Sequence, residues 1–314
     1  MSFFKTSVPS GLKEFQNQLE VTNLSELEFK TMSLPFRYSK KAIFYQIVCF
    51  FLFLGPIRII FCAFILTFAY VLIALIYIFI RILQLPSKTG RNLFYSIARF
   101  GVRSALFSFG IFYINTNQYF DESSRFAISN HIGILDLFIL SLYHDYTYVV
   151  DSHLKKIKLL SLFFDIFDPI YLKEKSKQNR IKVVCDAADD SNRPPILIFP
   201  EGFKSNGCGD VIMKFDKTAF VTPYKIQPIA IRYTMFGVMN NKINTYAYRF
   251  SEHPLSYLWR LFSMPPSIVH LRFLSSISMD RDGKSDIKTF VHNTQLLFGN
   301  QIGVCCVNYC DKKK

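Results

Sequence analysis

The sequence is poor in acidic residues and in charge of either sign. Of its 314 residues, 23 are Asp or Glu and 37 are Lys or Arg, so charged residues make up 19% and the formal net charge is +14. Apolar residues make up 50% and aromatic residues 17%, which excludes an intrinsically disordered chain. With 13 Gly, 13 Pro and no short repeat, collagen-like and low-complexity chains are excluded as well.

Cysteine spacings typical of disulfide frameworks or zinc sites are also missing. The seven cysteines are odd in number and include no C-x-x-C, so we predict reduced thiols in a protein that faces the cytosol, and no metal site. In a water-soluble protein, a charge of +14 would suggest a nucleic-acid partner, but the mean hydropathy here is +0.21. A composition that is both basic and apolar favours a membrane surface over nucleic acid.

One long segment has no charge at all. Residues 59–80 form a run of 22 uncharged residues, and a helix of that length measures about 33 Å, enough to cross the hydrocarbon core of a bilayer. A second apolar stretch, residues 42–54, precedes it, and Gly55, Pro56 and Arg58 separate the two. Two arrangements are open: a single span over residues 59–80, or a hairpin of both stretches that enters and leaves by one leaflet.

The flanking charges favour the hairpin. Basic residues stand before the apolar block at Lys40 and Lys41 and after it at Arg81, so the positive-inside rule places both ends in the cytosol. A cleaved signal peptide is not expected, because the apolar region begins more than 40 residues into the chain. We therefore predict a polar N-terminal segment over residues 1–41 and a membrane anchor over residues 42–85.

Beyond the anchor, strand-like and helix-like stretches alternate. Short β-branched and aromatic runs predict strands over residues 126–129, 147–150, 170–172, 196–199, 226–232 and 268–274. Helical spacing predicts helices over residues 136–142, 154–164, 176–188 and 285–298. The alternation predicts an α/β fold with a largely parallel sheet covered by helices, preceded by an N-terminal membrane-embedded helical hairpin or span. In such a sheet the functional loops lie at the carboxyl ends of the strands.

A histidine and an aspartate follow the first of these strands. Asn130 and His131 come directly after it, and Asp136 comes five residues after His131. On one helix, residues five apart lie about 140° from each other, so the two can meet only if His131 is in the turn before the helix and Asp136 in its first turn. Gly133 permits that turn. The carboxylate would then fix the imidazole tautomer and leave the other ring nitrogen to take a proton from a substrate hydroxyl. Alone, the pattern also fits a helix cap beside an incidental histidine.

A second motif follows the predicted strand 196–199. It is the run EGFKS over residues 201–205, seventy residues after His131. In this order and at this spacing, the two motifs resemble the glycerolipid acyltransferase family, typified by lysophosphatidic acid acyltransferases. Residues 130–136 are similar to the family's N-H-x4-D block, and residues 201–205 to its E-G-T-x-S block.

Further blocks extend this resemblance to residues 34–304. Residues 168–172 and 214–233 are similar to the family's second and fourth blocks. In detail the sequence is most similar to the lysophosphatidylcholine acyltransferase branch and to ancient ubiquitous protein, a lipid-droplet relative. The acyltransferase domain would then cover residues 86–300, followed by a short basic tail over residues 301–314.

The resemblance implies an acyl-CoA-dependent glycerolipid O-acyltransferase, which would move a fatty acyl group from acyl-CoA to a hydroxyl of a lysophospholipid or glycerol phosphate. It implies that His131 is the catalytic base and that Asp136 orients it. The residues that it implies in substrate binding are Glu201, Gly202, Lys204, Ser205, Lys173, Lys175 and Pro228. We expect acyl-CoA as a co-substrate, no other cofactor, no metal and no nucleic acid.

Two departures from the family pattern keep a rival function open. Glu174 stands where the family usually has an Arg that binds phosphate, although Lys173 and Lys175 flank it, and Phe203 replaces the usual Thr. The rival is a catalytically silent adaptor of the ancient ubiquitous protein type, against which the histidine–aspartate pair argues. The basic residues over 173–182 also fit a solvated helix face. We expect a protein of the endoplasmic reticulum membrane, or of the lipid droplet, with a catalytic domain that faces the cytosol.

Overall fold

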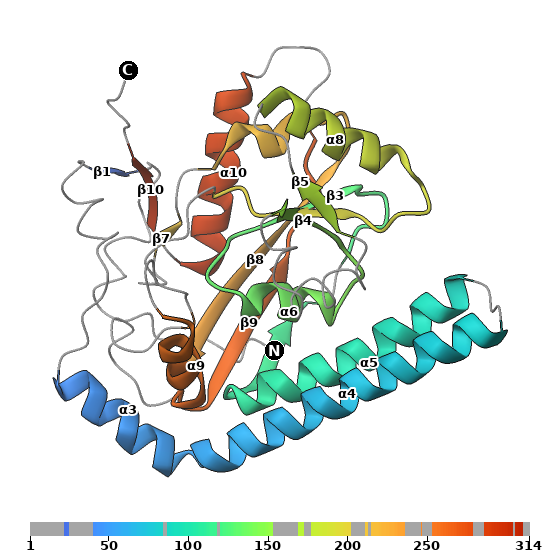
Figure 1. The fold of residues 1–314 in the computed structure, drawn as a ribbon. Helices are drawn as coiled ribbons and strands as arrows, with labels where there is room; N and C mark the ends of the chain where they lie inside the picture. Colours follow the sequence, from blue (N-terminus) through green and yellow to red (C-terminus); the bar gives the residue numbers. More distant parts are fainter. Residues whose placement is uncertain are drawn as a thin grey trace.

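A computed structural model of the chain shows an α/β fold built on one seven-stranded sheet (Figure 1). The structure describes residues 22–24, 40–83, 87–117, 120–152, 169–172, 177–201, 211–212, 215–235, 246, 253–278, 286–303 and 305–309. The strands lie in the order β2 (Ile111–Thr116), β9 (Ser267–Phe273), β8 (Ile226–Met235), β3 (Phe126–Ser129), β6 (Ile196–Ile198), β4 (Thr147–Asp151) and β5 (Ile170–Leu172).

The sheet is largely parallel, as the sequence predicts. Strands β8, β3, β6, β4 and β5 run in one direction, whereas β9 is antiparallel to β8 and β2 is parallel to β9. Ile128 in the middle strand β3 pairs with Ile198 on one side and Pro228 on the other. The carboxyl ends of five strands therefore meet at one edge of the sheet.

All six predicted strands are present, and their boundaries differ from the prediction by at most three residues. The largest difference is at β8, which extends to Met235 because it pairs with β9 along that length. The sequence did not indicate β2, an edge strand with an irregular pattern of buried and exposed residues. Its apolar side chains do not alternate, so the period-2 signal of a strand is weak.

Helices cover both faces of the sheet (Figure 1). On one face lie α5 (Ser87–Ser108), α6 (Leu135–Ser141) and α9 (Pro254–Phe262), which share a buried core with Ala127 of β3. On the other lie α8 (Lys177–Asp189), the 3₁₀ helix η2 (Lys217–Phe220) and α10 (Ile287–Ile302), which pack with Phe126 and Ile128. Neighbouring residues of β3 thus point to opposite cores, as strand geometry requires.

Three of the predicted helices correspond to α6, α8 and α10. Helix α10 runs to Ile302, four residues beyond the predicted end, and stops where Gly303 adopts a left-handed conformation with φ of 67°. The fourth predicted helix, residues 154–164, lies outside the described residues. Helices α5 and α9 were not predicted.

The predicted anchor forms two helices, α3 (Lys40–Leu52) and α4 (Gly55–Leu83). Figure 1 shows that α5 runs back alongside α4, while α3 meets α4 at an angle. The two apolar stretches, residues 42–54 and 59–80, therefore do not lie side by side as the predicted hairpin requires. Within α4, residues 55–72 have a mean hydropathy of 2.0 and are long enough to cross a membrane.

A small second sheet joins distant parts of the chain. Strand β10 (Cys305–Tyr309) lies between β1 (Thr22–Leu24) and β7 (Val211–Ile212). Part of the predicted basic tail is thus a strand, which pairs with the predicted polar N-terminal segment. The Cys306 thiol is buried there and donates to the Gln295 carbonyl at 3.1 Å.

Candidate active site

The loop after β3 carries the candidate base. His131 lies in this loop and Asp136 in the first turn of α6, and His131 Nδ1 is 3.0 Å from Asp136 Oδ2. The contact that the five-residue spacing predicts is therefore present. Because Asp136 can only accept when ionised, Nδ1 carries the proton of a neutral ring and Nε2 is the nitrogen left for a substrate. The His131 side chain is 19% exposed, whereas Asp136 is fully buried.

Four donors converge on the Asp136 carboxylate. Besides His131, the backbone N–H groups of Ile132 and Gly133 donate to Oδ2 at 2.6 and 2.8 Å. The Tyr233 hydroxyl donates to Oδ1 at 2.6 Å. A buried carboxylate needs such donors, because desolvation without them is costly. Asp136 thus fixes the backbone of its own loop and also orients the His131 imidazole.

Tyr233 is a residue of the site that the sequence did not single out. It stands near the carboxyl end of β8, next to β3, and its hydroxyl is 97 positions away from Asp136 in sequence. Burial raises the pKa of Tyr233 well above 10, and the neighbouring Asp136 raises it further. The phenol therefore stays protonated and remains a donor to the carboxylate throughout the physiological range.

Neighbouring strands hold the His131 loop on both sides. Asn130 pairs with the backbone of Ile231 in β8, donating to its carbonyl at 2.9 Å and accepting from its N–H at 2.8 Å. Glu201, just after β6, accepts from the His131 backbone N–H at 2.7 Å. The Phe199 ring stacks on the imidazole at 4.3 Å between centroids. The orientation of His131 is thus defined from both β6 and β8.

Gly133 is required by a close backbone approach. A Cβ atom at this position would lie 2.5 Å from the Tyr246 carbonyl oxygen and 3.3 Å from the Tyr257 hydroxyl. Tyr246 stacks on Tyr233 at 4.8 Å between centroids, and Tyr257 of α9 donates to the Tyr246 carbonyl at 3.0 Å. Burial also raises the pKa of Tyr246. Tyr233, Tyr246 and Tyr257 therefore pack together beside the His131 loop.

Comparison with known proteins agrees with this geometry. A family model described as "Acyltransferase" matches residues 112–232, which include β2, β3, α6, β6 and most of β8. This match covers less than half of the chain. The paired His131 and Asp136 lie within it, as do Glu201 and Pro228.

Two similar proteins are named as lysophospholipid acyltransferases. Lysophospholipid acyltransferase LPEAT2 of Arabidopsis thaliana is 27% identical over 142 residues, which are 44% of this chain and 26% of that protein. Lysophospholipid acyltransferase LPCAT4 of Mus musculus is 31% identical over 113 residues, 35% of this chain and 20% of the relative. The matched region thus spans about a quarter of the length of these curated relatives.

A solved structure shows the same fold. The 1-acyl-sn-glycerophosphate acyltransferase PlsC of Thermotoga maritima is similar with a TM-score of 0.50 over 83% of this chain and 94% of that one. At 12% sequence identity, this similarity is one of fold. It covers more of the chain than the family model does, and so includes elements on either side of residues 112–232.

The other predicted site residues differ in where they lie. Glu201 contacts the catalytic loop, as described above. Pro228 is buried within β8 at the level of Ile128, where its carbonyl accepts from the Leu274 N–H at 2.9 Å. The remaining predicted residues, Lys173, Lys175, Gly202, Lys204 and Ser205, lie outside the described residues, as do the departures Glu174 and Phe203. They follow the carboxyl ends of β5 and β6 in sequence.

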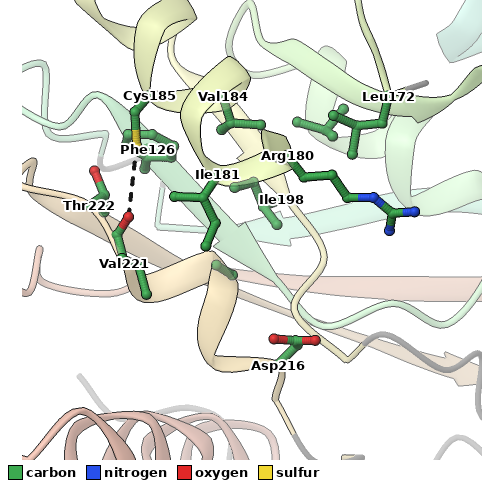
Figure 2. A pocket seen from close by; sticks show the side chains of 12 residues that line it. Phe126, Leu172, Arg180, Ile181, Val184, Cys185, Ile198, Asp216, Val221 and Thr222 are labelled. Atoms are coloured by element: carbon green, nitrogen blue, oxygen red, sulfur yellow. Dashed lines mark hydrogen bonds between the residues drawn. The ribbon is translucent and has the colours of Figure 1, made fainter. Parts of the chain in front are cut away.

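A cavity of about 160 Å³ lies on the face of the sheet that α8 and η2 cover, between these helices and the strands (Figure 2). Its walls are largely apolar, with Leu172, Val184 and Ile198 among them, and Arg180 and Asp216 stand apart from each other at its margin. Neither His131 nor Asp136 lines it. A cavity of this size is comparable to one that holds benzene, so it is too small for a whole lysolipid.

Within the described part of the chain, no group of three His, Cys, Asp or Glu side chains could hold a metal ion. The described site pairs a partly exposed histidine with a buried carboxylate.

Proposed function

We propose that this protein is a membrane-bound acyltransferase that moves a fatty acyl group from acyl-CoA to a hydroxyl of a lysophospholipid or glycerol phosphate. The observation that carries the proposal is the His131–Asp136 pair, held at the carboxyl ends of parallel strands with Nε2 left for a substrate. The names of the relatives support a lysophospholipid or 1-acylglycerophosphate acceptor. The charge of +14 suits an anionic donor such as acyl-CoA.

In the proposed reaction, His131 Nε2 takes the proton from the acceptor hydroxyl as its oxygen attacks the thioester carbonyl. The carbon–sulfur bond then breaks, and the departing thiolate takes that proton from the imidazolium. Asp136 keeps the proton on Nδ1 and stabilises the cation that forms on the ring. No acyl-enzyme is needed. Gly202, Lys204, Ser205, Lys173 and Lys175 are proposed to hold the phosphate, and Glu201 to position the His131 loop.

The proposed location is the membrane of the endoplasmic reticulum or the lipid droplet, with the catalytic domain facing the cytosol. Packing of α4 along α5 supports an anchor that stays on one side of the bilayer. Cys62, Ile65 and Ala69 of α4 are buried, and Gly101 of α5 brings the two helices close together. Since α5 carries several charged residues, a crossing by α4 in this arrangement would draw them into the hydrocarbon core.

Transfer of a labelled acyl group from acyl-CoA to a panel of lysophospholipids and glycerol 3-phosphate tests the proposal. We expect His131→Ala to lower the rate by about 10²- to 10⁴-fold, the usual contribution of a general base, without loss of expression or membrane association. Asp136→Asn should be nearly as damaging, because a neutral amide stabilises the imidazolium poorly. The matched control is His144→Ala, which removes a half-buried imidazole that stacks on Phe120.

If the parent protein transfers no acyl group to any acceptor, the enzyme proposal is wrong and the catalytically silent adaptor becomes the favoured hypothesis. If the His131→Ala variant retains the parent rate, the histidine is not the base.

A further inference from the structure

Helix α9 has apolar side chains on both of its faces. Tyr257 and Leu261 are buried, whereas Leu255, Leu258 and Trp259 are 69%, 42% and 37% exposed. The three exposed residues recur at a spacing of three and four, so they lie on one side of the helix. An apolar helix face is normally covered by protein or by lipid, and this one lies opposite the buried Tyr257, Arg260 and Leu261. The outward face of α9 therefore calls for an occupant.

Two contacts join α9 to the apolar helices of the anchor. The Trp259 ring packs on Phe50 of α3 at 4.4 Å between centroids. Arg58 of α4 donates through Nη1 to the Met264 carbonyl at 2.8 Å and to the Phe262 carbonyl at 3.4 Å, at the C-terminal end of α9. A cation is favourable at that end of a helix dipole. Arg58, the one charge between Lys41 and Arg81, thus fixes α9 to the start of α4.

The exposed face of α9 continues an apolar surface on α3 and α4. In α4 the buried side chains form a single stripe at Arg58, Cys62, Ile65 and Ala69. The other large apolar side chains of the first half of the helix are exposed; they include Ile57, Ile60, Phe61 and Phe64. Figure 1 shows α9 next to the elbow between α3 and α4, on the side of the molecule away from α8. Exposed apolar side chains on neighbouring helices mark a contact with protein or membrane.

A lipid leaflet is the occupant that this surface fits best. Residues 55–72 of α4 have the length and hydropathy of a membrane segment, and α9 is fastened to the start of that segment. Trp prefers the boundary between headgroups and acyl chains, and the net charge of +14 favours an anionic membrane surface. One leaflet would cover α3, α4 and α9 together.

We propose that α9 is a second membrane-docking element of this protein, which inserts Leu255, Leu258 and Trp259 into the leaflet that holds α3 and α4. This goes beyond the proposed activity, because it assigns a lipid contact to a helix outside the predicted anchor. It also links the bilayer to the active site. Tyr257 of α9 contacts the Tyr246 carbonyl, which in turn lies against Gly133 in the catalytic loop.

Trp259 is the single tryptophan of the chain, so native fluorescence reports on α9 directly. The experiment reconstitutes the full chain into vesicles of phosphatidylcholine and phosphatidylserine, with or without chain-brominated phosphatidylcholine. We expect the brominated lipid to remove at least half of the Trp259 emission, and aqueous acrylamide to quench it only weakly. The control variant carries Trp259→Phe with Val183→Trp, on the exposed side of α8, and should show the opposite pattern.

Emission that acrylamide quenches and brominated lipid does not would place α9 in water and overturn the proposal. If the protein still floats with the vesicles in that case, the membrane anchor stands and α9 alone is wrong. Emission shielded from both quenchers would mean that protein covers α9, such as a second copy of the chain, and would also overturn it. Failure of the chain to bind vesicles would overturn the proposal together with the proposed membrane location.

A pair of substitutions tests the side chains themselves. Leu255→Gln with Leu258→Gln should increase quenching of Trp259 by acrylamide at least twofold, with unchanged circular dichroism. The matched control, Val183→Gln with Val221→Gln, alters two exposed apolar residues in and beside α8, and should leave the quenching unchanged. Equal quenching in both variants would contradict the proposal.

Discussion

Asp136 takes its hydrogen-bond donors from separate parts of the chain. His131 and two backbone N–H groups belong to its own loop, while Tyr233 comes from β8. Together they orient the carboxylate, and the carboxylate in turn orients the imidazole. Tyr233 is thus a positioning residue, which acts on the proposed base through Asp136.

We expect Tyr233→Phe to lower kcat by about tenfold or more, because a hydrogen bond to a charged group contributes about 1.5–3 kcal/mol. The acceptor KM should change little, since Tyr233 contacts the aspartate and not the substrate. Steady-state kinetics in detergent micelles give both values. Tyr148→Phe is the matched control, because it removes another buried hydroxyl, one that donates to the Leu137 carbonyl at 3.1 Å. Equal kcat values for the two variants would contradict a positioning role.

At the scale of elements, α5 lies between α4 and α6, the helix that carries Asp136. Helix α5 packs on α4 where Gly101 meets Ala69, and its buried Tyr95, Ala98 and Val102 belong to the core around the sheet. From the same helix, Arg99 donates to the Ser141 carbonyl at the end of α6 at 3.1 Å and pairs with Asp145. Asp136 is in the first turn of that α6 helix. A displacement of α4 would therefore change the position of the Asp136 carboxylate through α5.

Gly101→Leu tests the packing between α4 and α5. A Cβ at this position would already lie 3.0 Å from the Ala69 Cβ, so a larger side chain must push the helices apart. We expect a loss of about 1–3 kcal/mol of stability, the usual cost of overpacking, seen as a lower Tm in detergent. Phe100→Leu, at an exposed position next to it, should leave Tm nearly unchanged. The packing interpretation fails if both variants melt with the parent.

At the scale of the whole molecule, the core around the sheet contains several buried tyrosines. Burial raises the pKa of Tyr146, Tyr148, Tyr233 and Tyr246 above the ordinary value of 10. In the unfolded chain these phenols ionise near pH 10, whereas in the folded protein they stay neutral. Above that pH the unfolded state therefore binds fewer protons than the native state, and stability falls as the pH rises.

We expect the free energy of unfolding to be constant with respect to these groups below about pH 9 and to fall steeply above about pH 10, by up to about 1.4 kcal/mol per pH unit for each tyrosine. Denaturant unfolding across this range measures the slope. Tyr146→Phe should reduce this slope by the contribution of one tyrosine, up to about 1.4 kcal/mol per pH unit. It should also be no less stable than the parent near neutral pH, because the Tyr146 hydroxyl has no hydrogen-bond partner among the described residues. A marked loss of stability in this variant would show that the hydroxyl is bonded.

Local patterns in the sequence were enough to predict much of the fold. The run 126–129 coincides with β3, and residues 170–172 coincide with β5, because short β-branched and aromatic runs between turn residues are decided by local propensity and burial. The spacing of His131 and Asp136 specified where each must lie for the two to meet, and both lie there, within one strand–loop–helix unit. Segments of this kind carry their own geometry.

Contacts between distant segments could not be read from such patterns. The pairing of α4 with α5 and the reversed direction of β2 and β9 depend on which apolar surfaces meet in three dimensions. Periodicity shows that a residue is apolar on one side, but it does not say what covers that side. Tyr233 reaches Asp136 across 97 positions because β8 lies next to β3. The outward face of α9 is unusual because Tyr257, Arg260 and Leu261 on the opposite side are buried in the domain. Tertiary packing decided these features, since it alone determines which buried and exposed surfaces become neighbours.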